Sequence, residues 1–233
     1  MAVRKPTMEE KREAARKLIL DVSMELFYTK GFDETTTRDI ITKAGILNGS
    51  LYNRFKNKDE ILVCMVHEGI SRIMGEAKVL MAQENNILLA SSFPGVIQIY
   101  LANRSERIAN ILYRVYCMWP AVEEYVTLML GWLDEFLAGM GYSSTDPETR
   151  KLSMINLLGS IGNTVGYYSH GGRLPFREAI KIHINEVALS LKFPVADVDA
   201  IAKRLEQIVG SLELKFLGHT LSEEIPELSR IVE

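Results

Sequence analysis

The chain has 233 residues, of which 47% are hydrophobic and 24% are charged. These values are typical of a globular protein and exclude a disordered chain, a collagen-like fibre and a disulfide-stapled miniprotein. The two cysteines, Cys64 and Cys117, have no spacing that indicates a disulfide framework or a metal site. The first segment is charged throughout and is no secretory signal, so we expect a cytoplasmic protein.

The charge is distributed unevenly along the chain. Residues 1–60 hold 12 Lys and Arg against 10 Asp and Glu, whereas residues 61–233 hold 15 against 20. A mildly basic head on an acidic body is typical of a small DNA-reading module attached to a second domain. Two uncharged stretches, 85–103 and 152–172, contain several polar residues. They predict buried bundle helices, and we expect no membrane partner.

The first 80 residues predict four helices. Apolar residues recur at three- and four-residue steps from 9 to 30, which indicates one helix with a buried stripe that ends at Gly31. Thr36, with Asp39 three residues on, predicts a capped helix that continues to about residue 44 and is broken by Gly45. A third helix is expected from near Asn48 to about residue 55, and a fourth begins near residue 59.

Beyond residue 80 the sequence predicts about five longer and more apolar helices, separated by Pro and Gly breaks. The last clear helix covers 197–214, and 217–233 is expected to be a polar tail with a weak helix. No run of alternating β-branched residues predicts a strand. We expect an all-α fold in which these breaks lie at 93–95, 119–120, 139–147, 171–175 and 193–194.

The segment from 36 to 55 is a helix, a tight turn and a helix, which is the layout of a helix-turn-helix module. Spacing alone leaves an ordinary helical hairpin open. The run GFDETTTRDIITKAGILNGSLYNRFKNKDEIL, however, resembles the DNA-binding head of the TetR family of transcriptional regulators. The features that match cover about a quarter of the chain and are Gly31-Phe32, Thr35-Thr36, Ile40, Ala44-Gly45, Gly49-Ser50, Leu51-Tyr52, Arg54-Phe55 and Lys58.

The resemblance implies two domains: a three-helix helix-turn-helix DNA-binding domain at 1–57 and a larger helical ligand-binding and dimerisation domain at 58–233. Three residues depart from the family pattern. Leu47 stands where Ser or Thr usually caps the recognition helix, so that Asn48 is the alternative cap one residue later. Ile41 replaces a common Ala, and Arg54 stands where His is frequent.

The expected DNA contacts fall into two groups. Phosphate contacts fix the position of such a head, and contacts to base edges give specificity. We expect phosphate contacts from Thr36 and Thr37 at a helix N-terminus, and from Tyr52, Arg54 and Lys58. Base-reading positions are expected on the outward side of the short recognition helix, at Asn48, Gly49, Ser50 and Asn53.

The resemblance also implies a homodimer and a small-molecule effector. Gly159, Gly162 and Gly166 lie on successive turns of the predicted helix 148–169, which indicates the close approach of another helix or a ligand. The expected dimer face pairs this helix with 176–191 or with 197–214, and packing within the chain is the alternative. Candidates for an apolar ligand pocket, each of which is alternatively a core residue, are Tyr113, Tyr116, Trp119, Trp132, Asn163 and Tyr167.

Enzyme motifs are missing from the sequence: the four histidines are scattered, and we find no HExxH, no Gly-rich phosphate loop and no nucleophile elbow. We expect no catalytic site, no metal and no cofactor, although an all-α enzyme assembled only in space is an open alternative. The function expected is a repressor that leaves a palindromic operator when a small hydrophobic or aromatic effector binds. The alternatives are a ligand-dependent activator or corepressor, or a helical interaction protein whose head does not bind DNA.

Overall fold

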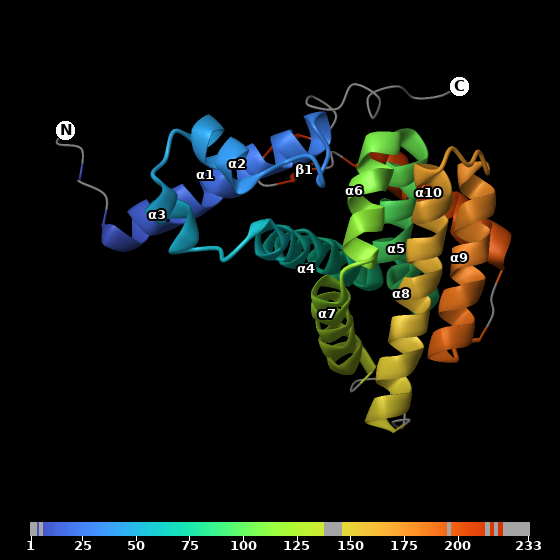
Figure 1. Ribbon diagram of the computed structural model, residues 1–233. Helices are drawn as coiled ribbons and strands as arrows, with labels where there is room; N and C mark the ends of the chain where they lie inside the picture. Colours follow the sequence, from blue (N-terminus) through green and yellow to red (C-terminus); the bar gives the residue numbers. More distant parts are fainter. Residues whose placement is uncertain are drawn as a thin grey trace. The chain divides into compact units, whose positions relative to one another are not determined.

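The computed structural model describes residues 4, 7–137, 146–194, 197–212, 215–216 and 219–220 (Figure 1). The chain divides into two compact units, Met1–Met65 and Val66–Glu233. One helix, α4 (Lys58–Glu84), begins in the N-terminal unit and continues into the C-terminal unit. The functional domain boundary that we expect between residues 57 and 58 stays a prediction.

Three helices and the start of α4 build the N-terminal unit: α1 (Met8–Thr29), α2 (Thr37–Ala44) and α3 (Asn48–Tyr52). Helix α1 contributes a stripe of buried side chains at helical spacing to the core, and α2 and α3 contribute one fully buried side chain each. The rings of Phe27 and Phe32 meet edge to face, with centroids 4.9 Å apart, where the chain leaves α1. The other fully buried side chains of this core include Ile19, Leu20, Ile40, Leu51 and Ile61.

The ends of α2 are those that the sequence predicts. The Thr36 hydroxyl accepts a hydrogen bond from the Asp39 backbone N–H, and the Asp39 carboxylate accepts one from the Thr36 backbone N–H. These reciprocal bonds form a capping box. At the other end Gly45 has a φ of +63°, which is left-handed backbone that glycine adopts without steric cost.

The recognition helix α3 is shorter than expected. It begins at Asn48 but ends at Tyr52, where we expected about residue 55. The backbone N–H groups of Arg54 and Phe55 both donate to the Leu51 carbonyl, so the last turn tightens and closes the helix early. The expectation that Asn48 caps α3 is wrong, because Leu47 occupies the capping position and makes no side-chain cap hydrogen bond.

The C-terminal unit is a helical bundle built around α5 (Ile87–Arg104), which is buried along almost its whole length. Helices α6 (Glu106–Tyr116), α8 (Pro147–Ser169), α9 (Phe176–Leu191) and α10 (Val198–Ser211) pack against α5, and α7 (Trp119–Leu137) packs on α6 and α8. The two uncharged stretches of the sequence are thus the bundle helices that we expected. No helix among the described residues is long and apolar enough to span a membrane.

One predicted helix break is wrong. Proline interrupts helices because it lacks an N–H and clashes with a carbonyl one turn back, yet α5 continues through Pro94. Two side chains supply hydrogen bonds around it: the Gln98 amide donates to the Pro94 carbonyl at 3.0 Å, and His183 Nε2 lies 3.1 Å from the Ser92 carbonyl. Burial of α5 on its neighbours then outweighs the local preference of the proline.

Ser105 begins a helix that the sequence analysis missed. Its hydroxyl accepts from the Ile108 backbone N–H and starts α6, so the described part of the C-terminal unit has six helices after α4 rather than five. The structure also has one unexpected antiparallel pair of two-residue strands, β1 (Lys215–Phe216) and β2 (His219–Thr220). The expected end of the last helix at 214, and most of the predicted tail 217–233, lie outside the described residues.

Candidate nucleic-acid interface

The helix-turn-helix predicted from the sequence is formed by α2, the turn at Gly45 and α3. Ile40 of α2 and Leu51 of α3 are completely buried, which fixes the two helices against the N-terminal core. Because these inward residues are fixed, most of the remaining positions of the five-residue α3 are turned to solvent, and Ser50 is half-buried. Asn48, Gly49, Tyr52 and Asn53 are all exposed, as expected for residues that read DNA.

Two of the expected phosphate contacts lie side by side. The hydroxyl oxygens of Thr37 on α2 and Tyr52 on α3 are 3.1 Å apart. Tyr52 keeps 52% of its surface exposed, so both hydroxyls lie at the surface of the helix-turn-helix. Thr37 also occupies the first turn of α2, where backbone N–H groups have no partner within the helix. The two helices therefore present adjacent hydrogen-bond donors to one acceptor.

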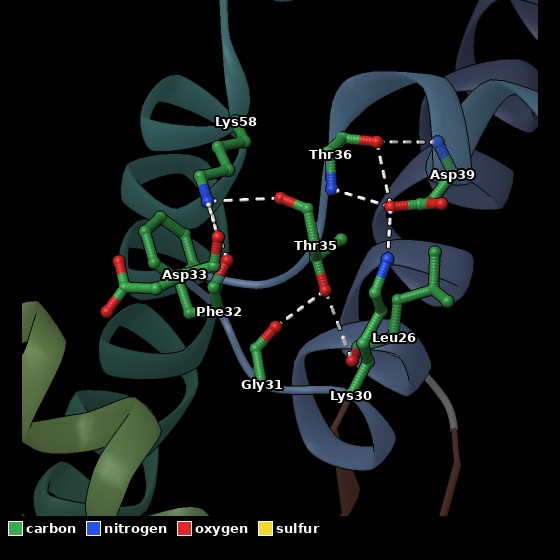
Figure 2. Close-up of polar contacts among 9 residues, drawn as sticks. All are labelled: Leu26, Lys30, Gly31, Phe32, Asp33, Thr35, Thr36, Asp39 and Lys58. Atoms are coloured by element: carbon green, nitrogen blue, oxygen red, sulfur yellow. Dashed lines mark hydrogen bonds and ion pairs between the residues drawn. The ribbon is translucent and has the colours of Figure 1, made fainter.

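Thr36, a third expected contact, is engaged within the N-terminal unit. Its backbone N–H and its hydroxyl both donate to Asp39 Oδ2, at 2.8 and 2.7 Å. Lys30 Nζ approaches the same oxygen at 2.6 Å (Figure 2). The Lys30 ammonium and the Thr36 donors hold the pKa of the Asp39 carboxyl well below its usual range. This carboxylate therefore stays ionised and ties α1 to the start of α2.

Lys58 is also held by the protein itself. Its Nζ atom donates to the backbone carbonyls of Phe32, Asp33 and Thr35, at 2.7, 3.0 and 3.0 Å (Figure 2). The same ammonium lies 4.5 Å from the centroid of the Phe32 ring. An ammonium has three N–H donors, and all three are used here. The resemblance implies a phosphate contact for Lys58, whereas in the structure Lys58 holds the segment between α1 and α2.

The Thr35 side chain completes this arrangement from the inside. It is fully buried, and its hydroxyl donates to the Gly31 carbonyl at 2.6 Å. The Thr35 carbonyl in turn accepts from Lys58. The residue directly before the α2 cap is therefore fixed through both its side chain and its backbone, which positions Thr36 and Thr37.

Arg54 and Ser50 contact each other. The guanidinium of Arg54 donates to the Ser50 carbonyl at 2.6 Å and lies 3.3 Å from the Ser50 hydroxyl. A cation at this place satisfies a carbonyl at the C-terminal end of α3. Both residues are half-buried, unlike Asn48, Gly49 and Asn53.

Two further exposed residues on these elements were not among the expected contacts. Arg38 follows Thr37 in the first turn of α2, and Leu47 directly precedes α3 with 83% of its surface exposed. A cation at a helix N-terminus is unfavourable for the helix dipole. The position of Arg38 therefore indicates a role other than helix stability, and the sequence alone shows this position. Leu47 was treated only as a missing cap.

The expected ligand-pocket residues differ in burial. Tyr116 and Trp132 are in the interior or at its edge, and Tyr113 is half-buried. Trp119, Asn163 and Tyr167 are exposed. Three of the six candidates are thus at the surface and three point inward. Aromatic identity alone does not reveal which face of a helix is buried.

A polar cluster that the sequence analysis missed surrounds Tyr116. The Tyr116 hydroxyl donates to Gln98 Oε1 at 2.6 Å, and Gln98 Nε2 donates to the Tyr125 hydroxyl at 2.6 Å. Burial raises the pKa of both phenols, so they remain neutral. An amide between two tyrosines within an apolar core orients polar groups in a dry environment. In the sequence Gln98 is surrounded by apolar residues of α5, so nothing around it indicates a polar cluster.

Two of the three α8 glycines have partners within the chain. A Cβ atom on Gly162 would lie 2.9 Å from Tyr116 Cβ, and one on Gly166 would lie 2.7 Å from Tyr113 Cε2. These glycines therefore let α6 approach α8. A Cβ on Gly159 would meet nothing within 4 Å. The packing alternative applies to Gly162 and Gly166, and only Gly159 lies on an open face.

Comparison with known proteins places these features in a class. Residues 19–64 match the family model for bacterial regulatory proteins of the tetR family. The repressor KstR2 of Rhodococcus jostii is 32% identical over 71 residues, which are 30% of this chain and 35% of that protein. The regulator YvkB of Bacillus subtilis is 25% identical over 158 residues, which are 66% of this chain and 81% of YvkB.

A solved structure from Syntrophomonas wolfei, described as a TetR-family transcriptional regulator, has the same fold. It is superimposed with a TM-score of 0.57 at 19% identity and covers 79% of this chain and 99% of its own. The chain thus spans about a third of the KstR2 relative and nearly all of this structural neighbour. The N-terminal unit is a helix-turn-helix DNA-binding head on a larger helical domain. Through this head the chain is similar to the TetR family of bacterial regulatory proteins.

Proposed function

We propose that the protein is a ligand-responsive transcriptional repressor that binds a palindromic DNA operator as a homodimer and leaves it when a small hydrophobic or aromatic effector binds. The observation that carries the proposal is the pair of adjacent hydroxyls on Thr37 and Tyr52, at the exposed surface of a helix-turn-helix. Named repressors among the relatives support the direction of regulation.

The contacts to DNA follow from the geometry of α2 and α3. Thr37, Tyr52 and the free N–H groups at the start of α2 are assigned to one phosphate, with Arg38 as a nearby cation. Asn48, Gly49 and Asn53 are assigned to base edges, since an amide pairs with adenine through two hydrogen bonds and glycine lets the backbone approach closely. Lys58, Thr36, Arg54 and Ser50 are assigned to the support of this surface, because they bond to other residues of the unit.

A homodimer is supported by an uncharged surface on α8 and α9, two helices that pack against each other. The exposed residues of α8 between 151 and 167 are Leu152, Asn156, Gly159, Asn163 and Tyr167. On α9 the exposed residues between 182 and 189 are Ile182, Asn185 and Leu189, and Leu189 is 76% exposed. Exposed apolar side chains grouped without charges mark an interface. A dimer also places two recognition helices on two half-sites of one operator.

The effector is assigned to the interior of the C-terminal unit. Gln98, Tyr116 and Tyr125 form a hydrogen-bonded polar cluster beside a largely apolar core, which is the composition of sites for apolar ligands with one or two hydrogen-bonding atoms. An effector that binds one arrangement of the bundle more tightly shifts the population toward it and changes the distance between the two heads.

The test is a selection of bound sites from a library of randomised duplex DNA with the full chain, followed by titration of the recovered sites in salt. The proposal predicts recovery of a palindrome whose affinity exceeds that of its scrambled version at every salt concentration. A thermal-shift panel on the same protein tests the effector class. Stabilisation by polar anions alone would contradict a hydrophobic effector, and recovery of no sequence preference would contradict the operator.

A further inference from the structure

Leu47 is the most exposed of the large apolar side chains among the described residues, with 83% of its surface in contact with solvent. It contributes nothing to the core of the N-terminal unit, in which Ile40 of α2 and Leu51 of α3 are fully buried. It also provides no cap, because Leu47 has no hydroxyl or carboxylate to bond the first N–H groups of α3. An apolar side chain held in water beside α3 has no structural role within the unit.

The surroundings of Leu47 are those of a surface that meets DNA. Asn48 and Gly49 follow it and are exposed, and a Cβ on Gly49 would meet nothing within 4 Å, so the approach from outside is open. Tyr52, one turn along α3, forms the pair with Thr37. Residues at the start of the second helix of a helix-turn-helix reach the base edges in the major groove.

The major groove offers one apolar group, the C5-methyl of thymine. We propose that Leu47 contacts a thymine methyl in each half-site of the operator and so determines sequence specificity at that base pair. This inference rests on the proposed function, since it requires that the helix-turn-helix enters the major groove. The neighbouring Asn48 amide fits the same preference, because an A·T pair shows an adenine edge for the amide and a methyl for the leucine.

The side chain at position 47 affects the stability of the unit and the recognition of DNA in opposite directions. A serine at this position would cap α3 and stabilise the unit, but it would leave the methyl without an apolar neighbour. Leu47→Ser is therefore expected to raise the melting temperature while it lowers the preference for thymine. These two effects have opposite signs, so a loss of recognition cannot be attributed to a loss of folding.

The experiment uses sites selected by the full chain from a randomised duplex library. Each thymine is replaced, one symmetric pair at a time, by deoxyuridine, which lacks only the methyl group, and affinities are measured by fluorescence anisotropy. Burial of one methyl corresponds to about a fourfold change in affinity per half-site. At one symmetric thymine pair we expect the replacement to lower the affinity of the unmodified protein about fifteenfold, counted over both half-sites. Replacement of any other thymine pair should lower the affinity less.

Three variants complete the design. Leu47→Ser is expected to bind the thymine and deoxyuridine duplexes equally well, whereas Leu47→Met, which keeps an apolar side chain, should retain the discrimination. Leu18→Ser replaces another exposed leucine, on α1 and outside the helix-turn-helix, and should leave it unchanged. Retention of the full thymine preference by Leu47→Ser, or the absence of any methyl-sensitive position, overturns the inference. Failure to select any site overturns the proposed function instead.

Discussion

The hydroxyl groups of Thr37 and Tyr52 lie 3.1 Å apart although the two residues are on different helices and fifteen positions apart in the sequence. Their pairing joins α2 to α3 at the surface, whereas Ile40 of α2 and Leu51 of α3 are fully buried. Each hydroxyl has one proton to donate and two lone pairs. A phosphate oxygen in front of the pair can therefore accept from one hydroxyl as they stand, and from both once the O–H groups rotate away from each other, without a change in the positions of the helices.

Tyr52→Phe and Thr37→Val are each expected to weaken binding to all DNA sequences by at least about tenfold per half-site, because a hydrogen bond to a charged acceptor is worth about 1.5–3 kcal/mol. Affinity for the selected operator and for an unrelated duplex should fall by the same factor, since phosphate contacts carry no sequence information. Asn53→Ala is the comparison and should change which sequences bind. A sequence-dependent loss in Tyr52→Phe would place this tyrosine on a base instead.

Lys58→Met should destabilise the N-terminal unit by about 1–3 kcal/mol, because three backbone carbonyls lose a charged donor. Hydrogen exchange of the α2 amides measures this loss locally. DNA affinity should fall with it, while the dependence of affinity on salt stays that of the unmodified protein. Lys56→Met, which removes a nearby exposed lysine, is the control for a general charge effect.

A direct phosphate contact by Lys58 gives a different result. The slope of log affinity against log salt would then decrease by about 0.9 for each lost contact, or about 1.8 for a dimer. Such a decrease in Lys58→Met would contradict the structural role assigned to this lysine.

Gly162→Ala should destabilise the C-terminal unit, because the added Cβ would lie 2.9 Å from the Cβ and Cγ atoms of Tyr116, which cannot move without disturbing its bond to Gln98. Gly131→Ala is the matched control on α7, where a Cβ meets nothing within 4 Å. Removal of a helical glycine there should stabilise by up to about 1 kcal/mol. Chemical denaturation followed by tryptophan fluorescence compares the two, and equal effects would contradict the close approach of α6 to α8.

Ile182→Lys combined with Leu189→Lys is expected to convert the dimer to a folded monomer. Both side chains are exposed on α9, so the substitutions disturb no core contact, while opposed lysines on a two-fold interface repel each other. Sedimentation velocity measures the mass and circular dichroism verifies the helix content. Val79→Lys, at an exposed apolar position on α4, is the control. A double variant that still sediments as a dimer would move the interface away from α9.

Stability should depend on pH through His183. Burial lowers the pKa of this histidine from its ordinary value of 6.5 to about 4, with the Ser92 carbonyl as its hydrogen-bond partner. Between these values the unfolded chain binds a proton that the folded chain does not, so the free energy of unfolding decreases as the pH falls from about 6.5 to about 4. The slope for one group is at most about 1.4 kcal/mol per pH unit.

The variant His183→Gln isolates this effect. Glutamine keeps a donor for the Ser92 carbonyl but does not titrate, so the difference in stability between the two proteins should shrink as the pH falls through this window. Urea denaturation at pH 7, 5.5 and 4.5 measures it. A difference that does not vary with pH would mean that folding leaves the pKa of His183 unchanged, which contradicts the effect of burial.

The parts of the fold that sequence reasoning predicted are those set by neighbouring residues. The capping box of Thr36 and Asp39 and the left-handed Gly45 are local signals, and both gave the bounds of α2 correctly. The continuous α5 was not predictable at Pro94, because the Gln98 and His183 hydrogen bonds that stabilise it depend on folding. Local rules describe helix ends well, whereas a buried helix is decided by what packs on it.

The same difference applies to the site. Tyr52 and Thr37 were identified from the resemblance, but only the structure brings their hydroxyls together. Lys58 was expected at a phosphate, since a lysine at a helix start near DNA suggests one. Its three carbonyl partners are formed by a loop 23 to 26 residues away in the sequence, so no local pattern reveals them. For the C-terminal unit, composition identified aromatic residues but not which of them face inward.

The central claim is that two identical heads read two half-sites of one operator. The most direct measurement compares the affinity of the full chain for the selected palindrome with its affinity for the same duplex after one half-site has been scrambled. The account predicts a loss of at least about a hundredfold, since half of the base contacts disappear while most phosphate contacts remain. Equal affinity for the two duplexes would contradict two-fold recognition.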